Sequence, residues 1–564
     1  MKSLTRKILA LLLVGALLLG PLAGCAFLGG GDPSYLPQGV QGPGEGGVEP
    51  LPVDISIPCD GRISISFVLD DALNPYTSTS RDNLAVAGLL YEGLYALGEN
   101  FTAIPMLAEG VTTLDGRRYT VTLRQGVTFH NGEGLTVEDL IYSLNRARNS
   151  PPFSGRLSIV SGYERRLDAQ GLALDYELDI LLNRTHGNIP LLLTFPIIPQ
   201  GSFGQSAPPG TGPYRFMDEG GPARLVGFPE HRYSAYLPVD PIYLTEIITM
   251  EQMTAHFNSG LLDIAALDLS ATGDPRLDAT RELRHFETSL MDFIGFNLQR
   301  PETRRVEVRQ AISLAIDRAY LTENIMRGNA VPASLPFHPT LFYYNELPTE
   351  ELEFDPLFAR WVLAGEASLT GPIHTFPAEE ENPTEPRDPE ASPGEDTEEG
   401  GGPMPHLTLL VASGNTNRLE TAAYIAASIA ELGYQVTVDD RPFPEFMQML
   451  EAGSFDLFYG QIRLQPDFDL TELLFGSLAF GGWGNLIDHR LHDDFLASSP
   501  SDRGLRAATL SQAMITEAPF AVIGFRHLTV ATQRGVVIGM QPTQENIYHN
   551  VWEWIVNLSS NASP

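Results

Sequence analysis

Strand-like and helix-like segments alternate along the sequence, and this alternation most limits the folds that the chain can adopt. Residues 62–69 alternate apolar and polar side chains as a half-buried strand does, and residues 84–95 place apolar side chains at helical spacing. The same order recurs at residues 118–123 and 136–145, and residues 420–438 predict a helix, a turn and a strand. Strands that alternate with helices indicate an α/β fold.

Two predicted helices carry more specific expectations. Thr136 is the expected N-cap of its helix, and Asp139 at the third helical position completes an arrangement like a capping box. Residues 309–326 predict the longest helix, in which Asp317 and Arg318 could form a local ion pair.

The composition excludes several classes of function but does not identify the function of this chain. The chain has 564 residues, of which 43% are hydrophobic, so we expect two or three domains with ordinary cores. Its formal net charge of −34 would repel phosphate backbones, so we expect no nucleic-acid partner. Lysine occurs only at Lys2 and Lys7, which excludes P-loop and pyridoxal-phosphate chemistry in the remaining chain.

The N-terminus has the pattern of an export signal. Three cations precede the apolar run at residues 8–19, which is shorter than the ~20 residues that span a bilayer. Leu22-Ala23-Gly24-Cys25 resembles a bacterial lipobox, whose Cys is lipidated. We therefore predict a signal peptide at residues 1–24, a lipid on Cys25 and a flexible tether at residues 25–58. The alternative is a plain signal peptide with an incidental Cys. Either way the protein is expected on the extracytoplasmic side, and with a lipid it is anchored to the cell membrane.

One internal segment breaks the alternation. Residues 378–405 hold ten acids, one Arg and six prolines, with almost no apolar side chains. Such a segment cannot bury enough surface to fold, so we predict a disordered acidic insertion. An acidic docking or cation-binding loop is the functional alternative.

The stretch at residues 104–145 carries the most telling motifs. Ile104–Gly110 reads I-P-M-L-A-E-G, and residues 115–124 read D-G-R-R-Y-T-V-T-L-R before residues 126–132, G-V-T-F-H-N-G. A helix opening with L-T-V-E-D follows, in which Val137 stands for a usual alanine. The stretch resembles the signature of family 5 extracellular solute-binding proteins, the dipeptide, oligopeptide and nickel receptors of ABC importers.

Three further stretches agree with this family and occur in its order. Residues 210–216 resemble the family's glycine–threonine–glycine–proline–tyrosine strand. Residues 295–297 with residues 308–318 match its third-domain entry helix, and residues 354–363 match the helix that follows. The resemblance covers roughly residues 63–556.

The resemblance implies an α/β periplasmic-binding-protein type II fold, with two lobes on a hinge and an extra inserted domain, the three-domain cluster C architecture. It implies binding of a small solute such as a peptide, delivery to a membrane permease with its ATPase, no enzymatic activity and no cofactor. We also expect a monomer. The implied division is domain I at residues 59–75, 205–292 and 525–558, domain II at 76–204 and domain III at 293–524.

In peptide-binding relatives an aspartate of the third domain neutralises the amine of the peptide. The corresponding stretch here is residues 455–470, in which Asp469 aligns with the second family aspartate. Pro466 occupies the amine-binding position, and Asp467 lies one place along. We predict Asp467 as the ligand anchor, with a solvated loop acid as the alternative. The departure from the family pattern puts peptide specificity in question.

Further candidates surround this stretch. Arg463 could bind a carboxylate bidentately or could pair with the neighbouring aspartates. Trp483 and Asn485 lie in a glycine-flanked stretch, where an indole could form a wall of the site or pack in the core. The remaining predicted binding residues are Tyr459, Asn74, Tyr76 and Tyr91.

A weak metal signal leaves a second function open. His489 and His492 are three residues apart among carboxylates, a spacing that can bind a metal on one helical turn, although a charged surface turn is the favoured interpretation. The alternatives are therefore a nickel, metal-chelate or haem receptor of the same fold, and a sensory or docking lipoprotein without transport. A hydrolase lacks sequence support, since neither Gly-x-Ser-x-Gly nor His-Glu-x-x-His occurs.

Overall fold

The computed structural model describes residues 62–269, 276–277, 281–369 and 404–557. The predicted signal peptide, Cys25, the tether and nearly all of the acidic insertion lie outside the described residues. Within the described part of the chain, no helix is long and apolar enough to cross a membrane.

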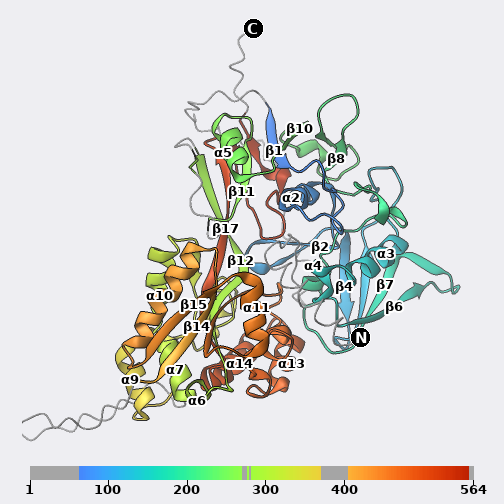
Figure 1. The fold of residues 1–564 in the computed structure, drawn as a ribbon. Helices are drawn as coiled ribbons and strands as arrows, with labels where there is room; N and C mark the ends of the chain where they lie inside the picture. Colours follow the sequence, from blue (N-terminus) through green and yellow to red (C-terminus); the bar gives the residue numbers. More distant parts are fainter. Residues whose placement is uncertain (1–61, 270–275, 278–280, 370–403, 558–564) are drawn as a thin grey trace, which may run out of the picture.

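One large sheet runs through the molecule (Figure 1), with the strand order β15-β14-β16-β12-β17-β11-β1-β10-β9-β8 and with β13 beside β17. Its strands are β1 (Ile63–Phe67), β8 (Tyr214–Met217), β9 (Arg224–Gly227), β10 (Ile242–Glu246), β11 (Ile264–Leu267), β12 (Arg281–Phe296), β13 (Ala330–Pro332), β14 (His406–Ala412), β15 (Gln435–Arg441), β16 (Leu457–Arg463) and β17 (Phe520–Gln533). A separate sheet has the order β4-β5-β7-β6 and consists of β4 (Ala108–Thr113), β5 (Arg118–Leu123), β6 (Val160–Leu167) and β7 (Ala173–Leu182). Two short pairs complete the strands, β2 (Tyr95–Leu97) with β3 (Ala103–Pro105) and β18 (Val537–Ile538) with β19 (Ile555–Val556).

Helices cover both sheets (Figure 1). They are α2 (Arg81–Leu90), α3 (Val137–Ala147), α4 (Pro151–Ser154), α5 (Met250–Asn258), α6 (Pro301–Arg304), α7 (Val306–Leu314), α8 (Arg318–Tyr320), α9 (Pro356–Ala364), α10 (Thr416–Ala430), α11 (Phe443–Ala452), α12 (Thr471–Leu474), α13 (His489–Ala497) and α14 (Arg503–Glu517).

Two long strands carry the large sheet from one lobe into the other. β12 has 16 residues and β17 has 14, and they pair antiparallel along most of their length. Their register shifts between Glu287 and Met291, so residues 288–290 form a bulge, which bends a strand and increases its twist. We call residues 288–290 the hinge bulge. The first lobe is then the described part of residues 62–287 with 527–557, and the second lobe is the described part of residues 291–526.

The first lobe has two parts. One holds the end of the large sheet from β11 to β8, with α2 and α5 beside it (Figure 1). The other, which we call the four-stranded subdomain (residues 92–198), holds β4–β7 with α3 against them. The domain boundaries drawn from the sequence remain a prediction.

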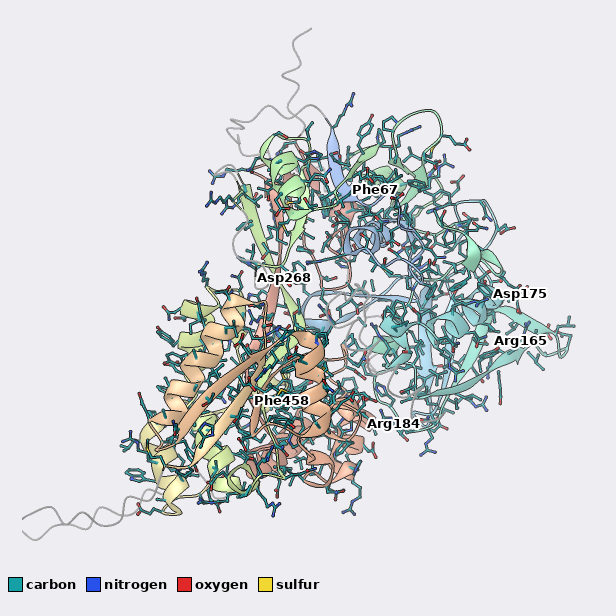
Figure 2. The ribbon with its side chains drawn as sticks, viewed as in Figure 1. Phe67, Arg165, Asp175, Arg184, Asp268 and Phe458 are labelled. Carbon is teal, nitrogen blue, oxygen red and sulfur yellow. The ribbon has the colours of Figure 1, made fainter. Side chains whose placement is uncertain are left out.

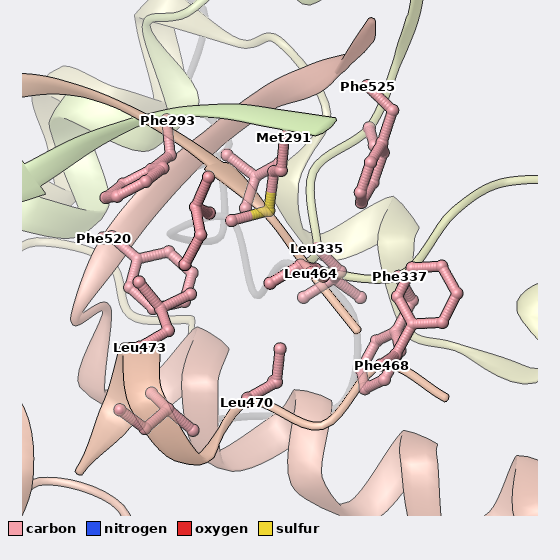
Figure 3. Packing of buried hydrophobic residues seen from close by; sticks show 14 of the residues in the cluster. Met291, Phe293, Leu335, Phe337, Leu464, Phe468, Leu470, Leu473, Phe520 and Phe525 are labelled. Carbon is pink, nitrogen blue, oxygen red and sulfur yellow. The ribbon is translucent and has the colours of Figure 1, made fainter. Parts of the chain in front are cut away.

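The second lobe is built around an apolar core where β12, β16 and β17 meet the helices that follow them (Figure 3). Burial of each large apolar side chain there contributes roughly 1.5–3 kcal/mol. Its members include Met291, Phe293, Leu335, Phe337, Leu464, Phe468, Leu470, Leu473, Phe520 and Phe525.

Several predicted elements are confirmed. The strand at residues 118–123 is β5, and the strand predicted at residues 62–69 forms at Ile63–Phe67. The helix that follows Thr136 is α3, where the Asp139 carboxylate accepts a hydrogen bond from the Thr136 backbone N–H at 3.0 Å. Gly433, between α10 and β15, has the positive φ of 95° expected beyond a helix end.

The longest predicted helix is wrong in its extent. α7 ends at Leu314, and Asp317 caps the short α8, accepting from the Tyr320 backbone N–H at 2.9 Å. Arg318 makes no ion pair with Asp317 among the described residues. Its buried guanidinium instead donates to the Val522 carbonyl at 2.8 Å, so a tertiary contact outweighs helical continuity.

The helix predicted at residues 84–95 also ends early. α2 stops at Leu90, and Tyr91 has an extended backbone that leads toward β2. Gly93 allows this path, since a Cβ there would lie 2.7 Å from the Thr194 carbonyl oxygen.

Glu92 fixes the point where the two parts of the first lobe join. Its buried carboxylate accepts from the Thr211 hydroxyl at 3.0 Å and lies 2.7 Å from the Arg232 guanidinium. Burial by itself raises the pKa of Glu92, but the charge of Arg232 and the contact with His231 lower it to about 2.

We expect this carboxylate to make the first lobe sensitive to acid. Because its pKa is lower in the folded chain than its usual value of 4.5, its stabilising effect is complete above about pH 4.5 and is lost toward pH 2. The loss corresponds to at most about 3 kcal/mol. Urea unfolding of wild type and Glu92→Gln at a series of pH values measures it. Their free energies of unfolding should run parallel from pH 5 to 7 and converge below pH 4.5; a constant difference down to pH 2 would contradict the assignment.

Candidate functional site

Strands from the two lobes end opposite each other at the hinge. β11 of the first lobe ends where Leu267 pairs with Thr529 of β17, and β16 of the second lobe ends where Arg463 pairs with Leu290 in the hinge bulge. Asp268, just after β11, lies at the junction of the lobes (Figure 2). In open α/β sheets, ligands bind in the crevice beyond the carboxyl ends of the strands, so this cleft is the candidate site.

A pocket of about 720 Å³ opens in the second lobe at the carboxyl end of β14 and along β16. A mostly apolar lining with a few polar side chains is typical of a small-molecule site. Most of the lining is apolar, and Arg418 and Gln461 supply the longest polar side chains. The apolar lining includes Phe293, Phe443, Phe446, Met447, Leu450, Phe458, Leu473, Leu478 and Phe480.

A chain of polar contacts connects this pocket to the hinge strands. Arg418 donates to the Gln461 side-chain oxygen at 3.2 Å, and the Gln461 amide donates to Asp292 at 2.8 Å. Asp292 on β12 forms an ion pair with Arg526 on β17, and both side chains are at most 1% exposed. Although burial lowers the pKa of Arg526, Asp292 and Tyr459 raise it above its usual value. The floor of the pocket is therefore tied to the strands that join the lobes.

The predicted ligand residue Tyr459 belongs to this network. It is buried on β16, lines the pocket, and its hydroxyl accepts from Arg526 at 3.5 Å.

The four-stranded subdomain contacts the second lobe directly. His186 lies 2.9 Å from Asp467, and Arg184 lies 2.8 Å from Asp469. Figure 2 shows Arg184 at the edge of the subdomain that faces the second lobe. The Gly187 backbone N–H also donates to the Leu496 carbonyl at 2.7 Å. We call this set of contacts between the lobes the lobe contact.

Asp467, the predicted anchor, is engaged in this contact. Its side chain is 1% exposed, and it accepts from His186 Nε2, since Nδ1 of that ring accepts from the Asn188 backbone N–H at 3.1 Å. Asp467 also borders a cavity of about 420 Å³ that is lined by residues of both lobes, including Asn100, Asn188 and Arg503. A role for Asp467 in ligand binding stays a prediction.

Asp469 is engaged as well. It pairs with Arg184, lies 3.3 Å from His492 and caps the Thr471 backbone N–H at 2.8 Å. Burial by itself raises the pKa of Asp469, but these neighbours, His492 first, hold it well below its usual range.

Arg463 pairs with neither aspartate. Its guanidinium donates to the Gln544 side-chain oxygen of the first lobe at 3.2 Å. Among the described residues, no carboxylate lies within ion-pair distance of Arg463, which is partly exposed at the cleft. Of the two interpretations made from sequence, the local ion pair is therefore wrong.

Trp483 lies in the core. It is fully buried, donates to the Phe296 carbonyl at 2.8 Å and stacks on Phe458 at 6.1 Å between ring centroids. The flanking Gly481 has a structural reason, because a Cβ there would lie 2.0 Å from that carbonyl oxygen. Asn485 is exposed at the surface of the second lobe. Neither residue is among those that line the pocket of the second lobe.

The predicted residues of the first lobe hold loops in place. Buried Asn74 donates to the Phe203 and Gln205 carbonyls at 2.9 and 3.0 Å. Tyr76 donates to the Pro196 carbonyl, and Tyr91 donates to the Pro208 carbonyl at 2.9 Å. Tyr91 also borders a cavity of about 810 Å³ inside the first lobe.

His489 and His492, the candidate metal ligands predicted from the sequence, lie in different environments. His492 is buried and its Nε2 accepts from the Leu470 backbone N–H at 3.0 Å, whereas His489 is exposed and stacks on Phe475 at 3.9 Å. Within the described residues, no group of three or more His, Cys, Asp or Glu side chains could hold a metal ion.

Another cavity, of about 1030 Å³, lies beside the hinge between Leu97–Phe101, Arg284–Glu287 and Met540–Gln544. At its edge Glu287 lies 2.9 Å from His338 and 3.0 Å from His527. Burial raises the pKa of Glu287, but these two histidines lower it to about 2.

The comparisons with known proteins agree with this geometry. The family model described as "Bacterial extracellular solute-binding proteins, family 5 Middle" matches residues 102–475. The oligopeptide-binding protein AppA of Bacillus subtilis is 23% identical over 312 residues, which are 52% of this chain and 56% of AppA. The chain thus spans only about half of the length of that relative.

Solved structures match over more of the chain. The ABC transporter substrate binding protein CtaP from Listeria monocytogenes has a TM-score of 0.66 at 17% identity, covering 88% of this chain and 99% of CtaP. NikZ from Campylobacter jejuni, solved with Ni(L-His), has a TM-score of 0.61 at 18% identity, covering 88% of this chain and 100% of NikZ.

Two lobes on a pair of long strands, with a pocket in the second lobe, define a hinged binding protein with the type II periplasmic-binding-protein fold. The chain belongs to the family 5 bacterial extracellular solute-binding proteins. Both conclusions confirm the predictions made from the motifs.

Sequence reasoning missed most of the residues that meet at the cleft and the lobe contact. Arg418 could have been found, because it opens a helix just after a strand, the usual position for a ligand contact in α/β proteins. His186, Asp292 and Arg526 carry no local signal, because their charged partners are distant in the sequence: Asp467 is 281 residues from His186, and Asp292 and Arg526 are 234 residues apart.

Loss of Asp292 should destabilise the hinge strongly. Asp292→Asn leaves the buried Arg526 guanidinium without its charged partner, for which we expect a cost of about 3–5 kcal/mol in the free energy of unfolding. Asp494→Asn is the matched control, because Asp494 is exposed and lies 3.8 Å from Arg506. It should cost less than about 1 kcal/mol. Urea unfolding of both variants measures the difference, and equal costs would contradict the role of Asp292.

Proposed function

We propose that this protein is the extracytoplasmic receptor of an ABC importer, which captures a peptide or similar small solute and delivers it to a membrane permease with its ATPase. The observation that carries the proposal is the apolar pocket of the second lobe, which lies along β16, the strand that ends at the hinge bulge. Arg418 and Gln461 give the pocket polar groups that can orient a solute. The Gln461 amide also donates to Asp292 on the hinge strand β12.

Capture follows from the geometry of the hinge. A solute in the pocket contacts the second lobe in every state, and it contacts the first lobe only when the lobes are closed. Binding therefore shifts the population toward the closed form, in proportion to the contacts made there. No bond is made or broken in this cycle, and no residue is assigned a catalytic role.

The anchoring to the membrane belongs to the same proposal. A lipid on Cys25 and a tether at residues 25–58 would hold a monomeric receptor near its permease. Labelling of the expressed full chain with a fatty-acid analogue would report the lipid, and Cys25→Ser should release the protein from the membrane.

Mass spectrometry of the solute released on denaturation of the purified protein tests the proposal directly. Calorimetry with that solute should then show binding with a stoichiometry of one. Failure to find any released solute, together with no binding to peptide, chelate or haem libraries, would contradict a receptor function.

Gly187 offers a test of closure away from the pocket. A Cβ at Gly187 would lie 1.8 Å from the Ser498 carbonyl oxygen, so Gly187→Ala should hold the lobe contact open. We expect at least tenfold weaker binding of the released solute and a larger radius of gyration in X-ray scattering.

Gly162→Ala is the control for this variant, because a Cβ there meets nothing within 4 Å and the residue lies in the same four-stranded subdomain, on β6. It should bind as wild type does. Unchanged affinity of Gly187→Ala would show that closure at the lobe contact plays no part in capture.

A further inference from the structure

Two phenylalanines from opposite lobes meet in a backbone conformation that is unusual for such residues. Phe101, in the turn between β2 and β3 of the first lobe, contacts Phe468 of the second lobe edge to face, with 5.0 Å between the ring centroids. Both side chains are buried, and both residues have positive φ angles, 56° for Phe101 and 59° for Phe468. A bulky residue in this region is strained, and it persists only where the surrounding structure holds it there. The strain in both residues is therefore found at one contact between the lobes.

The turn that carries Phe101 does not itself require a phenylalanine. The Thr102 backbone N–H donates to the Glu99 carbonyl at 3.1 Å, and the two residues between them, Asn100 and Phe101, both have positive φ. This is the pattern of a type I′ turn, whose usual sequence is Asn-Gly. Phe101 stands in the place of that glycine. Because glycine would suit the turn better, the reason for the ring lies outside the turn, in its contact with the second lobe.

The second lobe receives the ring of Phe101 between two of its own rings. The imidazole of His338 lies 5.0 Å from Phe101 on another side from Phe468, and it is fully buried. Its Nδ1 accepts from the Thr340 backbone N–H at 3.2 Å, which fixes the ring in its loop. Its Nε2 lies 2.9 Å from Glu287 of the first lobe, so His338 is contacted by the first lobe twice.

The contact of the two phenylalanine rings continues the lobe contact. On either side of Phe468 in the chain, Asp467 lies 2.9 Å from His186 and Asp469 lies 2.8 Å from Arg184. The first lobe thus contacts three successive residues of the second lobe, the outer two through charged groups and the middle one through an aromatic ring.

The packing around Phe101 is open on two sides. Phe101 borders the cavity of about 1030 Å³ beside the hinge, and it also borders the cavity of about 420 Å³ that is lined by both lobes. The ring therefore bridges the lobes between two cavities, and its removal would join empty space rather than be filled by neighbours.

We propose that Phe101 and Phe468 form a clasp that holds the two lobes together in the absence of a solute. The ring contact sustains the strained backbone at both residues, and it exists only while the lobes are together. Opening separates the rings and allows both segments to relax, so the clasp keeps the open and closed forms close in free energy. A small difference in solute contacts between the two forms is then enough to shift their populations. The inference goes beyond the proposed function, because it concerns the protein without its solute.

Hydrogen exchange of the solute-free full chain, measured by mass spectrometry, tests the clasp. Phe101→Gly removes the ring and gives the turn a residue that it favours. We expect at least tenfold faster exchange in residues 184–188, because the Gly187 amide is protected by the Leu496 carbonyl of the other lobe. Residues 118–123 on β5 pair within the four-stranded subdomain and should exchange as in wild type. X-ray scattering should show a larger radius of gyration for the variant.

Two further variants make the test specific. Phe101→Asn should behave as Phe101→Gly does, since Asn also tolerates positive φ. Leu114→Gly is the control, because Leu114 is fully exposed between β4 and β5 of the same subdomain, and it should behave as wild type.

Wild-type exchange at residues 184–188 in both Phe101 variants would overturn the clasp. Equal acceleration in residues 118–123 would overturn it as well, because the ring would then serve the stability of the subdomain and not the contact between the lobes. Neither result bears on the receptor function, which is tested separately by the solute that denaturation releases.

Discussion

The ion pair between Asp292 and Arg526 is the constraint on which the arrangement of the lobes depends. It joins the two long strands just beyond the hinge bulge, where both side chains are removed from water. A buried charge left alone is costly, so the two strands must keep this register. The Asp292 carboxylate also accepts a hydrogen bond from Gln461, whose side-chain oxygen accepts from Arg418. These two hydrogen bonds connect the hinge strand to the wall of the pocket.

Two regions between the lobes differ in how completely their charges are paired. At the lobe contact, Asp467 and Asp469 are satisfied by His186 and Arg184 from the first lobe. At the end of β16, Arg463 has no ion pair within the described residues, and its guanidinium donates a hydrogen bond to Gln544 of the first lobe.

Sequence patterns predicted the elements whose causes are local. The strand at residues 118–123 and the helix after Thr136 follow from alternation and capping, which involve neighbouring residues. The sequence patterns failed where a contact with a residue far away in the sequence determined the local structure. The helix predicted at residues 309–326 breaks where Arg318 reaches the Val522 carbonyl. Gly481 beside Trp483 allows close packing against the Phe296 carbonyl in the core rather than against a ligand.

The sequence by itself determined the family, the α/β class and the presence of candidate charges such as Arg463 and Asp467, because motifs and periodicity are properties of short stretches. Only the tertiary structure decided which charges are paired. Asp467 meets a histidine 281 positions earlier in the chain, while Arg463, four residues before it, has no ion pair within the described residues. Whether two charged side chains form an ion pair depends on the distance between them in space, which only the tertiary fold determines.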